Sequence, residues 1–128
     1  MANGDATEIQ YICNFTSSIK VTVLSSTAPS TKVEKINQRY TFLLSHDGSA
    51  SYINLNHGVK IPLTAIVDKN QTVFIERANG DNLFVVTVFN SQNKDKKHPA
   101  IYSFSAWKED SSSFYYPSMD FGSCIKSN

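Results

Sequence analysis

The sequence contains few glycines, few cysteines and no excess of charge of either sign, and each shortage excludes a class of protein. The five glycines are scattered, so the chain has no glycine-rich phosphate-binding loop. Lys and Arg total 12 against 11 for Asp and Glu, which gives a formal charge of +1 and no field for strong nucleic-acid binding. No apolar run reaches the roughly 18 residues that span a bilayer as a helix. We therefore expect no nucleic-acid partner and no membrane-spanning segment.

The two cysteines, Cys13 and Cys124, lie near opposite ends of the chain. A bridge between them would restrict the unfolded chain and stabilise the fold by roughly 4–5 kcal/mol in the loop-entropy model. Two cysteines in 128 residues do not make a disulfide scaffold, however, and a zinc site needs more ligands at tighter spacing. We expect two buried free thiols, with the bridge as the alternative, and no metal or cofactor.

The N-terminal residues 1–7 are polar and lack the basic segment and apolar core of a signal peptide. We expect them to be a flexible segment ahead of one domain that covers residues 8–128, because a chain of this length forms a single core. Three localisations fit this pattern: the cytoplasm, secretion without a leader, or an extracellular location after removal of a leader.

The apolar residues are of the kinds that favour β-strands. Nine Val and ten Ile outnumber six Leu, and the chain adds six Tyr and eight Phe. Branching at Cβ restricts a side chain in a helix and suits a pleated sheet. Abundant Ser, Asn and Thr suit turns and the solvated face of a sheet. The composition therefore predicts an all-β protein.

Alternation of apolar and polar residues predicts the first strands. Apolar side chains alternate along Ile9–Phe15 and again along Ile19–Val23, and Thr16–Ser18 between them is expected to be a turn. After a polar loop, the segment from Thr31 is expected to be extended or to form one helical turn, with a strand from about Arg39.

Turn residues divide the rest of the chain. The Asp-Gly pair at 47–48 and the Asn-Gly pair at 79–80 predict hairpin tips. A strand over Val59–Val67 contains Pro62, which has no N–H for a sheet ladder, so this strand is expected to be an edge, bulged or broken there.

The C-terminal half contains the most apolar strand. Leu83–Phe89 is apolar apart from one threonine and is expected in the middle of a sheet, covered on both faces. Ile101–Lys108 carries Tyr102 and alternate residues after it on one face, whereas Phe114–Ile125 is aromatic without a period. About eight or nine short strands predict an antiparallel β-sandwich, with a closed β-barrel as the alternative.

Two groups of side chains are candidates for ligand binding. Aromatic rings stack on the C–H faces of sugars, and short planar polar side chains at loop tips pair with sugar hydroxyls. We therefore predict a non-enzymatic, lectin-like module that binds a glycan or glycoconjugate. The residues expected to stack or to bind hydroxyls are Tyr115, Tyr116, Trp107, Asp47, Asn79, Asp81 and Asn82.

Two other functions remain as alternatives, and enzymatic activity is not expected. A membrane-active, lipid-binding or pore-forming toxin component would place Phe114–Tyr116 at a membrane surface and Lys94, Lys96 and Lys97 on headgroups. A structural or adhesive subunit would form a homo-oligomer through an exposed sheet edge. No Gly-x-Ser-x-Gly or His-Glu-x-x-His motif is present, so no catalytic constellation can be placed.

Overall fold

The computed structural model describes residues 8–24, 30–54, 58–78, 82–108, 114–115 and 117–127, of which 22–24, 54, 77–78, 82, 106–108 and 114–115 are described by their backbone alone. All regular elements in these ranges are strands. They are β1 (Ile9–Leu24), β2 (Ser30–Leu44), β3 (Ala50–Asn54), β4 (Val59–Val67), β5 (Gln71–Ala78), β6 (Asn82–Phe89), β7 (His98–Lys108), β8 (Phe114–Tyr115) and β9 (Ser118–Ser127). Within the described part, no helix is long and apolar enough to cross a membrane.

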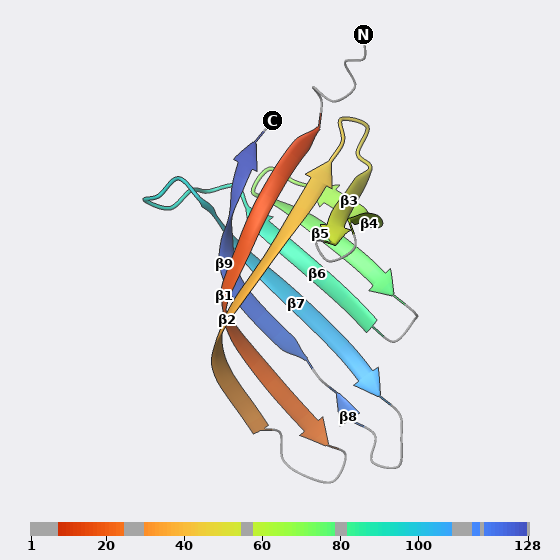
Figure 1. The fold of residues 1–128 in the computed structure, drawn as a ribbon, viewed down its shortest axis with the longest axis vertical. Helices are drawn as coiled ribbons and strands as arrows, with labels where there is room; N and C mark the ends of the chain where they lie inside the picture. The colour runs from red at the N-terminus through yellow and green to blue at the C-terminus, as the bar shows by residue number, and fades with distance from the viewer. Residues whose placement is uncertain are drawn as a thin grey trace.

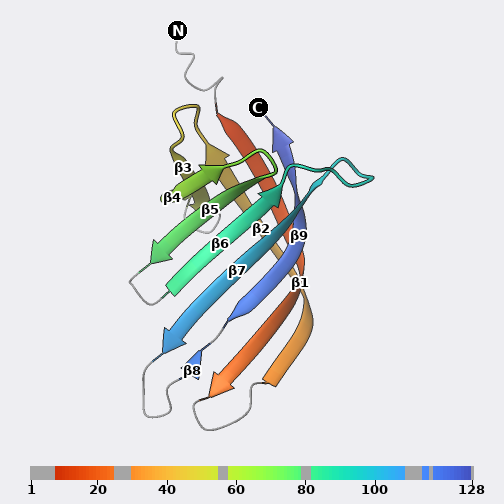
Figure 2. The same cartoon turned by 180° about the vertical axis from the view of Figure 1, so that it is seen from behind.

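The strands form an up-and-down meander that closes on itself. Each strand runs antiparallel to its neighbours, and β1 pairs with β2 on one side and β9 on the other, which completes a ring of eight strands (Figures 1 and 2). The short β8 bridges β7 and β1 beyond the start of β9. The all-β prediction is confirmed, and of the two expected architectures the closed barrel is the one formed, because the first and last long strands pair.

Three segments differ from their predicted boundaries. β1 runs unbroken through Thr16–Ser18, so the turn predicted there is wrong; a bulge between Phe15 and Ser17 shifts the register instead. The bulge lets Phe15 and Ser18 both be buried although they are an odd number of residues apart. β2 starts at Ser30, well before Arg39, because β1 provides a continuous partner. The aperiodic C-terminal segment contains β9.

The core fills one end of the barrel with aromatic rings. Phe15, Phe42 and Phe74 are fully buried, and the rings of Phe42 and Phe74 stack with centroids 5.2 Å apart. Tyr11 meets Phe74 edge-on at 5.6 Å. These rings come from β1, β2 and β5, so they hold opposite walls of the barrel together.

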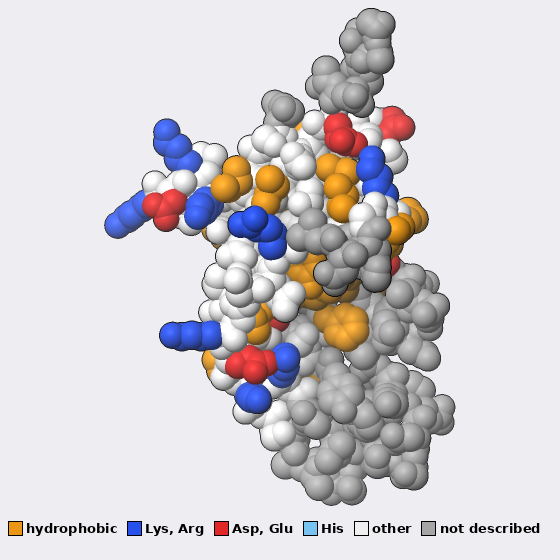
Figure 3. All heavy atoms as spheres, in the orientation of Figure 1, with side chains coloured by type: hydrophobic (Ala, Val, Ile, Leu, Met, Phe, Trp, Pro, Cys, Tyr) orange, Lys and Arg blue, Asp and Glu red, His pale blue; other side chains and the backbone are white. Residues whose placement is uncertain are grey.

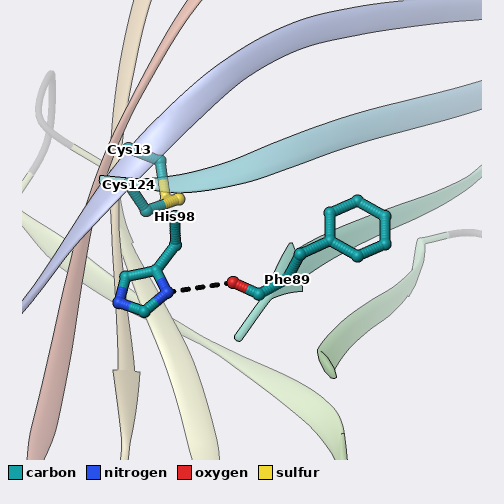
Figure 4. The surroundings of a disulfide bond; sticks show 4 residues. All are labelled: Cys13, Phe89, His98 and Cys124. Atoms are coloured by element: carbon teal, nitrogen blue, oxygen red, sulfur yellow. Dashed lines mark hydrogen bonds between the residues drawn. A yellow bond between two sulfur atoms is a disulfide. The ribbon is translucent and has the colours of Figure 1, made fainter. Parts of the chain in front are cut away.

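A disulfide joins the first and last long strands. Cys13 on β1 lies directly opposite Cys124 on β9, both side chains are fully buried, and the two are bonded (Figure 4). His98 on β7 is the next residue across the sheet, and its ring Nδ1–H donates to the Phe89 carbonyl oxygen at 3.0 Å. The expectation of free thiols is therefore wrong: the barrel brings together two cysteines that are 111 residues apart in sequence.

The barrel is closed at one end and open at the other. Near the closed end, Thr41–Leu44 of β2 pairs with β3, but no described strand pairs with that same edge over residues 30–40. On the facing wall, β4 pairs with β5 only from Thr64 onward, just after Pro62. β4 itself continues through Pro62, which lies opposite Ser51 of β3. Of the three predicted alternatives the strand is therefore an edge at the proline, unpaired on its β5 side, and it is neither bulged nor broken there. Among the described residues, the walls formed by β2 and by β4 and β5 are therefore not joined by strand pairing in this half, which we call the open end.

β6 occupies the middle of the sheet, between β5 and β7, as predicted. Its predicted cover on both faces is wrong, because Leu83 is 38% exposed on the outside while Val86 and Val88 are buried inside. A barrel has one packed interior, whereas a sandwich strand of this apolar character would be expected to have a layer on each side.

Candidate binding site at the open end of the barrel

Four polar side chains form a row across the inside of the barrel. The register places Tyr102 opposite Asp120, Asp120 opposite Ser18, and Ser18 opposite Glu34, across β7, β9, β1 and β2. Directly opposed residues of antiparallel strands project to the same face of a sheet. Tyr102 contacts the buried ring of Phe15, so that face is the barrel interior. We call these four residues the polar row.

Aromatic rings line the same space. Tyr40 and Tyr102 stack with centroids 5.3 Å apart, Phe84 meets Tyr102 edge-on at 5.2 Å, and Tyr52 lies 5.5 Å from Phe84. We call Tyr40, Tyr52, Phe84 and Tyr102 the ring cluster. The three tyrosines are half-buried and pack against the fully buried rings of Phe15 and Phe42. On the face drawn in Figure 3, hydrophobic side chains are visible at several places on the described surface.

The three phenols of the ring cluster are held in their protonated form. Burial raises the pKa of Tyr102, Tyr40 and Tyr52 above the usual 10.0. Nearby carboxylates add to the effect, Asp120 at Tyr40 and Tyr102 and Glu76 at Tyr52. At neutral pH each phenol is therefore protonated. The Tyr52 hydroxyl donates to Glu76 Oε1 at 3.5 Å, and the hydroxyls of Tyr40 and Tyr102 are hydrogen-bonded to each other.

Alkaline titration tests this assignment. The folded-state pKa of these phenols lies above 10.0, their unfolded value, so the native state binds more protons above pH 10 and its stability falls as pH rises. We expect phenolate absorbance to show a late-titrating fraction among the six tyrosines that ionises together with unfolding. Tyr102→Phe is expected to shrink that fraction. Titration of every tyrosine near pH 10, with the fold intact, would contradict the burial of the ring cluster.

A buried hydroxyl in the polar row has no partner. Ser18 is fully buried, and among the described residues its Oγ is the buried side-chain polar atom without a hydrogen bond. It sits between two carboxylate-bearing residues in register, Glu34 and Asp120. An unpaired buried hydroxyl costs about 1–3 kcal/mol, so this atom is an unfavourable feature of the polar row as the structure describes it.

The outer part of the polar row carries an ion pair. Lys20 Nζ lies 2.6 Å from Glu34 Oε1, and Lys32 Nζ lies 3.7 Å from Glu34 Oε2. The hydrogen bond and charge of Lys20 hold the pKa of Glu34 below its usual value, and the same contact raises the pKa of Lys20. Lys20 and Glu34 are both solvent-accessible, so their ion pair adds little to the stability of the fold. Its main effect is to place charged groups at the open end.

The side chain of Asp47, predicted to bind hydroxyls, shapes a turn. Its Oδ1 accepts hydrogen bonds from the Ser49 N–H at 2.9 Å and the Ser49 hydroxyl at 2.7 Å, which lowers the pKa of the carboxyl. Gly48 beside it has φ +93°, as a hairpin tip requires. The predicted turn is confirmed, and the carboxylate is already engaged within it.

The other predicted residues are only partly described. Trp107 on β7 and Tyr115 on β8 lie directly opposite one another in register, so the fold brings these two aromatic positions together. Asn82 lies at the start of β6, opposite Ala106. Asn79, Asp81 and Tyr116 lie outside the described residues.

The meander separates some of the predicted residues. The turn that carries Asp47 joins β2 to β3 at the closed end, whereas β5 and β7 end, and β6 begins, at the open end (Figure 1). Asp47 and Asn82 therefore lie at opposite ends of the barrel and cannot share one site. The connection from β6 to β7, which contains Lys94, Lys96 and Lys97, is at the closed end, so these lysines do not lie beside Phe114 and Tyr115 of β8.

Comparison with known proteins adds no assignment: no protein-family model, curated protein or solved structure matches the chain. Among the described residues, no group of three or more His, Cys, Asp or Glu side chains is placed to hold a metal ion.

The ring cluster and the polar row are the residues that analysis of the sequence missed. Tyr102 was identified on one face of its strand, but its partners come from four other strands. Ser18 was assigned to a turn, and Asp120 to an aperiodic segment. The available signal was weak: it was the alternation of Tyr40 with Phe42 in β2 and of Tyr102 with Phe104 in β7.

Proposed function

We propose that the protein is a non-enzymatic binding module that takes a hydroxylated ring ligand, a sugar unit of a glycan, into the open end of the barrel. The mouths of small β-barrels are preferred ligand sites because the strands there present side chains without a packed core above them. The ring cluster supplies faces for stacking. The carboxylates of Asp120 and Glu76 supply acceptors for ligand hydroxyls, and the phenols supply donors.

The unpaired hydroxyl of Ser18 is the observation that carries the proposal. Stacked rings occur in any aromatic core, so they do not by themselves point to a ligand. The buried Ser18 hydroxyl without a partner lowers the stability of the fold, and packing does not compensate for this loss. A ligand hydroxyl that reaches the polar row would satisfy Ser18 and one of the carboxylates together. Specificity would follow, since a site built around polar groups rejects a ligand that leaves them unpaired.

Ser18→Ala separates binding from stability. We expect this change to raise the free energy of unfolding by about 1 kcal/mol, because it removes a buried group without a partner, and to weaken glycan binding by roughly tenfold. A glycan array identifies the best-bound glycan, calorimetric titration measures its affinity, and denaturant unfolding measures stability. Ser17→Ala, at the exposed neighbouring position, is the matched control and is expected to change neither.

Asp120→Asn and Asp47→Ala locate the site. Loss of affinity in Asp120→Asn with none in Asp47→Ala supports binding at the open end. The reverse result would return the site to the loop tips, where the predicted roles of Tyr115, Tyr116, Trp107 and Asn79 would then be tested in turn. Failure of the unaltered protein to bind any glycan, or a less stable Ser18→Ala variant, would overturn the proposal.

A further inference from the structure

The lower half of β2 is an unpaired sheet edge. Residues 30–36 pair with β1 on one side, and no described strand pairs with them on the other. Figures 1 and 2 both show this part of β2 at the outer margin of the sheet, with β1 between it and the rest of the barrel. Such an edge is a template for another strand unless it is blocked.

This edge contains no proline over residues 30–36, and it exposes an apolar side chain. Val33 is 71% exposed, the highest value among the large hydrophobic side chains described. It lies on the outer face in register with Ile19 of β1, which in turn lies opposite the exposed Met119 of β9. Val33 thus ends an apolar row that stops abruptly at the free edge.

The charges on the edge favour one register for self-pairing, because only one of the registers centred on residues 30–36 places opposite charges face to face. When two copies of an antiparallel strand pair about a two-fold axis, one residue faces its own copy and its neighbours face each other. Centring on Lys32, Glu34 or Lys35 puts like charges opposite one another. Centring on Val33 instead places Lys32 of each copy opposite Glu34 of the other and brings the two valines together.

We propose that two copies of this chain associate through the β2 edges, antiparallel and centred on Val33. Within one copy, Lys20 Nζ lies 2.6 Å from Glu34 Oε1, but Lys32 Nζ lies 3.7 Å from Glu34 Oε2. Glu34 Oε2 is therefore available to pair with Lys32 of the second copy. The Lys32 side chain is 75% exposed and therefore free to reach across. A two-fold contact uses each edge once, so the assembly closes as a dimer and does not extend into a fibre.

Sedimentation velocity at a series of protein concentrations tests the dimer without any glycan. The unaltered protein is expected to sediment faster as concentration rises, with the limit of a dimer. Lys32→Glu and Glu34→Lys each put like charges at both crossing points and are expected to weaken association by about tenfold or more. Lys20→Gln breaks the same ion pair within the chain but leaves the edge charges unchanged, so it is expected to associate like the unaltered protein.

Mixing the two charge-reversal variants gives the decisive result. A copy with Glu at 32 and 34 is complementary to a copy with Lys at both positions, so the mixture is expected to recover the association that each variant loses alone. Recovery cannot arise from misfolding, because a misfolded chain would not regain a specific partner. A protein that stays monomeric at every concentration, association that survives both reversals, or a mixture that remains monomeric overturns the proposal.

Discussion

Replacing Cys13 and Cys124 together by alanine is expected to lower the free energy of unfolding by roughly 4–5 kcal/mol, the largest effect of any change considered. The disulfide spans 111 residues, so its loss releases almost the whole unfolded chain from a cross-link. The bond also joins β1 to β9, the pairing that closes the barrel. Since a domain of this size is stable by about 5–15 kcal/mol, the reduced protein is expected to be marginal.

Denaturant unfolding with and without reductant provides the measurement. The unaltered protein is expected to fall to the stability of the double variant when reductant is present, and the variant is expected not to respond to reductant. His98→Ala serves as a comparison, because it removes a neighbouring buried side chain and its hydrogen bond to Phe89 but leaves the cross-link. Equal stability of the reduced and oxidised proteins would show that the bond contributes nothing to the fold.

Gly122→Ala is expected to cost about 3 kcal/mol or more, although it adds a single methyl group. A Cβ at Gly122 would overlap the carbonyl oxygen of Asn14 and lie 2.7 Å from the Cα of Phe15. Both are backbone atoms at the bulge of β1, so no side chain can turn aside to make room. The strand would have to move away from β9 next to the disulfide.

Gly48→Ala is the matched control. Nothing lies within 4 Å of a Cβ built there, but its φ of +93° is unfavourable for alanine, so a cost of about 1–2 kcal/mol is expected. Thermal and denaturant unfolding of the two variants compare a steric conflict with a conformational one. If Gly122→Ala were no more destabilising than Gly48→Ala, the close approach of β1 to β9 would not be a feature of the folded protein.

Local pattern predicted the elements whose neighbours are close in sequence. The Asp-Gly turn at 47–48, the strand that contains Pro62 and the alternating strand that contains Tyr102 all follow from rules that act over a few residues. The bulge in β1 does not, because three small polar residues in succession resemble a turn unless strands on both sides hold them extended.

The candidate site was less predictable than the fold. Its residues come from β1, β2, β3, β6, β7 and β9, and each belongs to a strand whose own pattern shows only that it faces inward. The residue types at polar loop tips predicted recognition there, because each turn residue carries a signal of its own. Asp120 and Ser18 lie side by side only because β9 pairs with β1. A site assembled in this way has no local signature in the sequence.

By itself, the sequence determined that the chain is all-β, antiparallel and built from short-range hairpins, because strand propensity and turn geometry are properties of neighbouring residues. The tertiary structure alone decided that the sheet closes, that the two cysteines bond and that a buried serine lies between two acids. Each of these depends on β1 pairing with β9 across more than a hundred residues of chain, and no local rule determines such a contact.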